Sequence, residues 1–64
     1  MKFHISPYQK KNSIPELCAL ATLAEGTIDG NSWMQPVTIT VEDAMQEIVE
    51  ELLEDAGYKF SIGR

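Results

Sequence analysis

Carboxylates are the side chains of this sequence whose number and spacing could do chemistry. Seven of the ten acidic residues fall between positions 42 and 55, namely Glu42, Asp43, Glu47, Glu50, Glu51, Glu54 and Asp55. Paired carboxylates act as general acid and base when a shared site pushes their pKa values apart. The spacing here instead places them on the convex outer face of one helix, where water screens charge. We therefore expect them to bind a partner and not to catalyse a reaction.

The other reactive residue types do not complete a catalytic or metal site. His4 is the only histidine and Cys18 the only cysteine, which is too few ligands for a structural zinc site and does not supply a triad. The glycines match no phosphate-binding loop, and Asp29-Gly30-Asn31 lacks the closing glutamate of a calcium loop. We expect no catalytic residue, no metal and no cofactor, and an inert, buried Cys18 thiol.

The acidic residues belong to a predicted helix over residues 41–56. Its apolar positions recur at the helical spacing without a miss: Val41, Ala44, Met45, Ile48, Val49, Leu52, Leu53 and Ala56. Thr40 is the expected N-cap and Gly57 the residue that ends the helix. Acid pairs four residues apart each cost about 0.2–0.5 kcal/mol, and Glu54 and Asp55 lie at the negative end of the helix dipole.

Further elements follow from periodicity and turn residues. Alternating apolar residues predict strands over residues 2–6, 37–41 and 58–62. Ser13 to Glu16 is a capping-box pattern that predicts the start of another helix, the first along the chain. Gly26 is expected to end this helix. Residues 26–35 are rich in turn formers, with a possible short hairpin of 27–29 and 32–34.

These elements predict one domain, residues 1–64, of the α+β class. We expect two layers, with a three-stranded sheet and two helices packed on one face, in the order strand, helix, turn or hairpin, strand, helix, strand. The strands joined by a helix can be parallel with a right-handed crossover, and a first strand antiparallel to the others is equally open.

The charge distribution indicates the class of partner. The net charge of −5 lies entirely in residues 40–64. Direct nucleic-acid binding and anionic membrane surfaces both require a basic patch, so we expect neither. A single cysteine suits a reducing compartment, and the longest apolar run, residues 17–24, is too short to cross a bilayer. We expect a cytoplasmic protein.

Two functions from different classes remain. In the first, the protein is a small acidic regulator or inhibitor, of the kind encoded by phages or acting as an antitoxin. Its acidic helix docks on a basic, nucleic-acid-handling protein, where it can act as a nucleic-acid mimic. The expected binding residues are Glu47, Glu50, Glu51, Glu54, Asp55 and Trp33. Trp33 is weighed as an interface anchor against a cap on the edge of the core.

The strand, Thr-capped acidic helix and strand of residues 37–62 resemble the corresponding stretch of HicB-type antitoxins. The resemblance covers less than half the chain and rests on a generic pattern, so we assign no family from it. In the second function, the chain is a non-catalytic assembly module. Its apolar first helix, with Cys18, Leu20 and Leu23, would then pair with a second copy or a larger subunit.

Overall fold

The computed structural model describes residues 1–63. Its elements are β1 (Lys2–Ile5), α1 (Ile14–Leu23), β2 (Thr27–Asp29), β3 (Val37–Thr40), the 3-10 turn η1 (Asp43–Met45), α2 (Gln46–Asp55) and β4 (Phe60–Gly63). The expected α+β class with two helices is confirmed, but the sheet has four strands where three were predicted.

The fourth strand, β2, comes from the turn-rich segment. Its three residues pair antiparallel with β3, with Ile28 opposite Ile39. The first arm of the predicted hairpin is therefore a strand, whereas the second arm is wrong. Residues 32–35 form a turn in which the Gln35 N–H donates to the Ser32 carbonyl at 3.2 Å. Three residues are too few for alternation to distinguish a strand from a loop, so only the partner strand defines β2.

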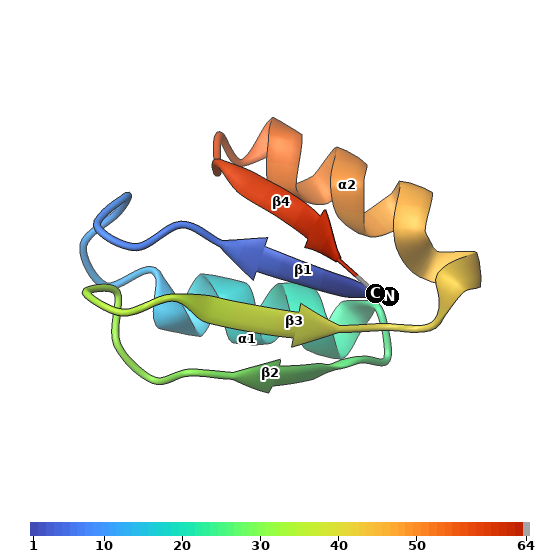
Figure 1. Cartoon of the computed structure of the whole chain (residues 1–64), viewed down its shortest axis with the longest axis horizontal. Helices are drawn as coiled ribbons and strands as arrows, with labels where there is room; N and C mark the ends of the chain where they lie inside the picture. The colour runs from blue at the N-terminus through green and yellow to red at the C-terminus, as the bar shows by residue number, and fades with distance from the viewer. Residues whose placement is uncertain (64) are drawn as a thin grey trace.

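The sheet has the order β2-β3-β1-β4, and every neighbouring pair is antiparallel. Consequently β1 and β2 run parallel with β3 between them, and β3 and β4 run parallel with β1 between them. This connectivity is that of two interleaved, split β-α-β units, the ferredoxin-like arrangement. Each helix joins two parallel strands that are not neighbours in the sheet (Figure 1). The first strand, β1, is antiparallel to both of its neighbours, β3 and β4.

One face of the sheet forms the core with both helices. Phe3 and Ile39 are directly opposite each other on β1 and β3, and both are fully buried. They belong to one buried cluster with Leu17 of α1 and with Val49 and Leu53 of α2, so both helices pack on this face. Burying such side chains contributes about 1.5–3 kcal/mol each.

The acidic helix is shorter than predicted, and its start differs. Val41 is a core residue ahead of the helix, and Thr40 belongs to β3, so the predicted Thr40 cap is wrong. The chain is still extended at Glu42 (φ −69°, ψ 151°), and the first turn is the tighter η1. The end is as predicted. Gly57 has φ 82°, and the N–H of Tyr58 donates to the Leu53 carbonyl at 3.0 Å, which is a Schellman motif.

The end of α1 uses a different residue from the one expected. Glu25, not Gly26, has the left-handed backbone, with φ 56°. The N–H of Gly26 then donates to the Ala21 carbonyl at 2.8 Å, completing the Schellman motif. Gly26 is needed for another reason, because a Cβ atom there would overlap the Thr40 carbonyl oxygen and the Val41 side chain. The chain leaving α1 is thus pressed against the end of β3.

The C-terminus of α2 contacts a lysine from a distant loop. Lys10 Nζ donates a hydrogen bond to the Ala56 carbonyl and lies 4.4 Å from the centre of the Tyr58 ring. Lys10 and Ala56 lie 46 positions apart in the sequence. A cation at a helix C-terminus is stabilising, so Lys10 offsets the unfavourable placement of Glu54 and Asp55.

We predict that Gly26→Ala lowers the free energy of unfolding by about 1–3 kcal/mol, because the new methyl group must displace backbone. Urea denaturation measures this loss. Gly57→Ala is the comparison, since its Cβ would meet nothing closer than Lys10 Nζ at 4.0 Å and only its φ of 82° opposes alanine. A Gly26→Ala protein as stable as the wild type would contradict the close approach.

We predict that Lys10→Met lowers the free energy of unfolding by about 1 kcal/mol, since it removes a cation from a helix C-terminus and from an aromatic face. Methionine retains an apolar stem of similar length, and Lys11→Met, at the exposed neighbouring position, is the control. Part of the difference should disappear in high salt, where charge is screened. Equal losses for the two variants would exclude a specific role for Lys10.

Candidate protein-binding surfaces

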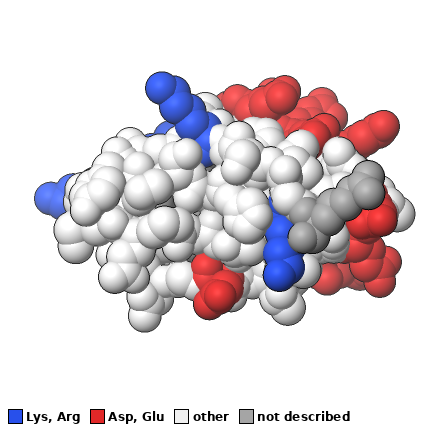
Figure 2. All heavy atoms as spheres, viewed as in Figure 1, with Lys and Arg blue, Asp and Glu red and all other residues white. Residues whose placement is uncertain are grey.

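The five predicted binding carboxylates all lie on α2. Glu47, Glu51, Glu54 and Asp55 are exposed, and Glu50 is partly buried and accepts a hydrogen bond from Gln46 Nε2 at 3.3 Å. Figure 2 shows acidic side chains gathered over α2 and the segment that leads into it. Within residues 1–63, none of the five forms an ion pair. Their charges are therefore not neutralised by a basic side chain among these residues.

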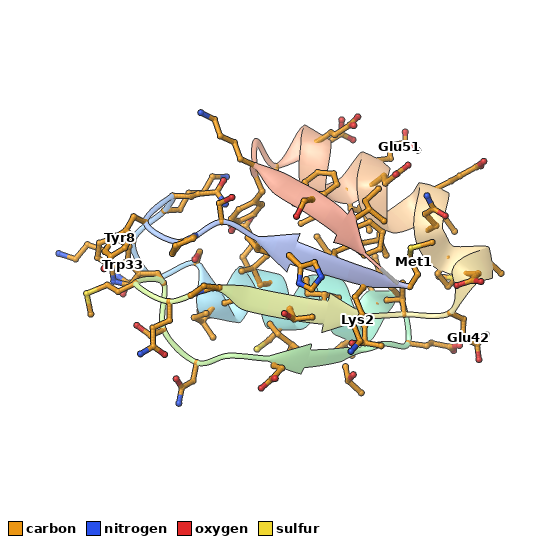
Figure 3. The ribbon with its side chains drawn as sticks, viewed as in Figure 1. Met1, Lys2, Tyr8, Trp33, Glu42 and Glu51 are labelled. Atoms are coloured by element: carbon orange, nitrogen blue, oxygen red, sulfur yellow. The ribbon has the colours of Figure 1, made fainter. Side chains whose placement is uncertain are left out.

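The one ion pair found among residues 1–63 involves the acidic segment ahead of α2. The Met1 ammonium lies 3.3 Å from Asp43 Oδ1 and donates to the Val41 carbonyl at 3.0 Å. Figure 3 shows Met1 beside the start of this segment, with Glu42 further out. Asp43 is thus engaged within the protein.

Two of the acidic residues line a groove, which corrects the expectation of a purely convex face. The groove has a volume of about 570 Å³ and is lined by Glu50, Glu54, Tyr58, Lys59, Phe60 and Ile62. One wall is therefore a flank of α2, and the other wall and floor come from β4 and the residues just before it. The helix periodicity alone could not reveal this groove, because it depends on which strand lies beside α2.

Tyr58, one of the residues that line this groove, is largely buried. Its side chain is 5% exposed, and its hydroxyl has no hydrogen-bond partner within residues 1–63. Burial raises the pKa of the Tyr58 hydroxyl, and the Glu16 carboxylate raises it further. The phenol is therefore neutral at physiological pH. The Tyr58 side chain is part of the core cluster.

A second, mostly apolar groove runs between the two helices. It has a volume of about 300 Å³ and is lined by Glu16, Ala19, Leu20, Leu23, Leu52 and Ala56. Leu23 is 68% exposed, whereas Leu20 is 9% exposed and belongs to the core. Cys18 is only partly buried, in contrast to the expected buried thiol. Of the three residues proposed for assembly, Leu23 is the one that the fold leaves open.

Trp33 lies away from the acidic helix. Its ring packs edge-to-face on Tyr8 with 5.7 Å between the centroids, and its carbonyl accepts a hydrogen bond from the Tyr8 N–H at 2.8 Å. Figure 3 shows this pair at the end of the molecule opposite Glu42 and Met1. The structure therefore does not join Trp33 and the carboxylates into one site. Trp33 is also outside the core cluster, so the alternative role as a core cap is wrong.

Metal-ligating side chains do not gather into a site among residues 1–63. No group of three or more His, Cys, Asp or Glu side chains is close enough there to hold a metal ion. His4 lies on the open face of the sheet, with Nδ1 3.3 Å from Thr38 Oγ1. Among the same residues, no helix has the length and apolar character needed to span a membrane.

Comparisons with known proteins returned no relative. No protein-family model, no curated protein and no solved structure matches this chain. The resemblance of residues 37–62 to HicB-type antitoxins therefore rests on the sequence pattern alone.

Proposed function

We propose that this chain is a small acidic regulator or inhibitor that binds a basic surface on a nucleic-acid-handling protein. The observation that carries the proposal is the set of five carboxylates on α2, which form no ion pair within residues 1–63. Acid pairs four residues apart destabilise a helix. An acid-only face is therefore retained against its local cost, which is expected if another molecule uses the charge.

The geometry of the helix suits imitation of a nucleic-acid backbone. Residues on a helix rise by about 1.5 Å each, so Glu47 and Glu54 are separated by roughly 10 Å along the axis. Negative charges repeated over this length present a basic surface with a row of anions comparable to phosphates. Attraction at long range also accelerates association with a basic partner. Phage-encoded proteins and antitoxins are the classes in which we place such a cytoplasmic inhibitor.

The apolar groove between the helices supports a second candidate, a non-catalytic assembly module. Leu23 is 68% exposed beside Leu52 and Ala56, and exposed apolar surface of this kind can pair with a second copy or a larger subunit. The two candidates respond differently to salt, since charge pairing weakens with ionic strength and apolar association does not.

For the assembly candidate we predict that Leu23→Glu shifts the mass in solution toward monomer. Leu23 is the informative position because Leu20 is a core residue whose replacement would unfold the protein. Analytical ultracentrifugation over a range of concentrations measures the mass, and Thr22→Glu, at the exposed neighbouring position, is the control. A wild type that is monomeric throughout, or a mass that Leu23→Glu leaves unchanged, would reject self-assembly through this groove.

For the regulator candidate we predict that Glu50→Gln, Glu51→Gln and Glu54→Gln together weaken partner binding by about tenfold or more, because several charge pairs are lost at once. Partners are captured from a lysate at low salt, eluted with salt and identified. The regulator proposal is supported if a captured nucleic-acid-binding protein is identified and its DNA or RNA binding is inhibited by the wild type and not by the triple variant.

The control variant removes the same number of charges elsewhere, by Glu25→Gln, Asp29→Asn and Glu42→Gln. Because both variants have the same net charge, a difference between them reports the position of the acidic residues and not total charge. The α2 variant should unfold no more easily than the wild type, since it removes like-charge pairs. Equal inhibition by the α2 variant and the wild type would reject the proposal.

A further inference from the structure

The strand β4 is an edge of the sheet with one side open. Of the strands in residues 1–63, β4 pairs with β1 alone, with Phe60 opposite Ile5 and Ile62 opposite Phe3. In an antiparallel pair, every second residue directs its N–H and C=O groups toward the partner strand. The Ser6 N–H donates to the Lys59 carbonyl at 3.1 Å, so Lys59 and Ser61 face β1. The backbone groups of Phe60 and Ile62 therefore point outward.

This edge lacks several devices that usually protect an open strand. Edge strands are commonly blocked by proline, by a bulge or by a covering element. Residues 60–63 contain no proline, and β4 pairs with β1 in continuous register over four residues. Ile62 is 42% exposed along it. By contrast, the other edge strand, β2, is only three residues long and ends at the exposed Asp29.

The groove beside β4 supplies room and charge for an added strand. Glu50 and Glu54 form one wall, and Phe60 and Ile62 lie along the strand itself. An extended segment that pairs with β4 presents alternate side chains to opposite faces of the sheet. One set would face the helix layer, where these two carboxylates lie. Lys or Arg at every second position would therefore meet them.

We propose that the open edge of β4 binds an extended, basic peptide segment by strand addition, with its cationic side chains directed toward Glu50 and Glu54. This inference rests on the proposed function and specifies how the basic partner is held. Backbone hydrogen bonds to Phe60 and Ile62 provide affinity, and the carboxylates select the side chains, which is the usual division in strand addition. The occupant of the β4 edge is a flexible basic arm of the partner.

A second copy of this chain is a poorer occupant of the same edge. Pairing of two β4 strands would bring Glu50 and Glu54 of both copies together, and like charges across an interface are unfavourable. Self-association that is lost on blocking β4 would overturn the assignment to a basic peptide.

The test uses a synthetic peptide of about eight residues in which Lys and Val alternate, with blocked ends and a fluorescent label. Ile62→Pro removes the outward N–H without touching a bond to β1, and proline is tolerated at such edge positions. Ile62→Ala retains the N–H and is the matched control. By fluorescence anisotropy we expect about tenfold weaker binding for Ile62→Pro and less than about threefold for Ile62→Ala.

A second measurement keeps the proposal testable even if Ile62→Pro is unstable. Amide hydrogen exchange at Phe60 and Ile62 in the wild-type protein should slow when the peptide is added, because new backbone bonds protect these groups. The same peptide with N-methylated alternate residues cannot form the ladder and should give no protection. Unchanged exchange at both residues in the presence of bound peptide would overturn strand addition.

The two proposals fail separately. If the partner captured from lysate is lost by the α2 triple variant and retained by Ile62→Pro, strand addition is wrong and the acidic regulator stands. If the triple variant still binds and inhibits that partner, the regulator proposal is wrong. Equal binding of the Lys–Val peptide to the wild type and the triple variant would overturn the role of the carboxylates in the groove.

Discussion

The pairing of β1 with both β3 and β4 is the constraint on which the rest of the structure depends. Within the sheet formed by residues 1–63, the four residues of β1 join β3, from the middle of the chain, to the last strand, β4. Phe3, at the centre of β1, is fully buried between Ile39 and Ile62 of the neighbouring strands and contacts the Phe60 ring, with 5.9 Å between centroids. Because β1 occupies the middle, β4 is displaced to the edge, and α2 is carried there with it.

The same constraint explains how an unfavourable helix is stable. α2 contains acid pairs at repulsive spacing and has no basic residue in its last turn. Two stabilising features of the fold offset this cost. Val49 and Leu53 are fully buried under the sheet, and Lys10 approaches the helix end from the loop after β1. Tertiary packing thus stabilises a helix whose local electrostatics are unfavourable. The acidic face itself is not needed for this packing.

The surfaces of the protein are divided in space. Acidic residues gather over α2 and beside the β4 edge, the apolar groove lies between α1 and α2, and the Tyr8–Trp33 pair lies at the far end of the molecule (Figure 3). A partner bound through charge therefore does not need the aromatic pair. Docking uses the acidic face of α2, whereas self-association through Leu23 uses α1 and the groove between the two helices, so the two functions are separable by mutation.

Local patterns in the sequence predicted both helices, the three longer strands and the acidic helix face. Helical spacing predicted α2 and the exposure of most of its carboxylates. Alternation predicted the three longer strands. Both patterns depend only on neighbours a few residues apart. The end of α2 at Gly57 was also predicted from adjacent residues alone. The possible hairpin was right for its first arm, which is β2, and wrong for its second arm. The tight turn η1 and the αL position at Glu25 were missed, since nothing in their own residues distinguishes them from other loops.

Only the tertiary structure decided which of these residues share a site. Strand order placed β4 beside α2 and so created the groove of Glu50, Glu54, Phe60 and Ile62. It also brought Lys10 to Ala56 and separated Trp33 from the acidic residues. These relations join residues far apart in the chain. They depend on which pairing buries the most apolar surface, a property of the whole fold that no local window of sequence contains.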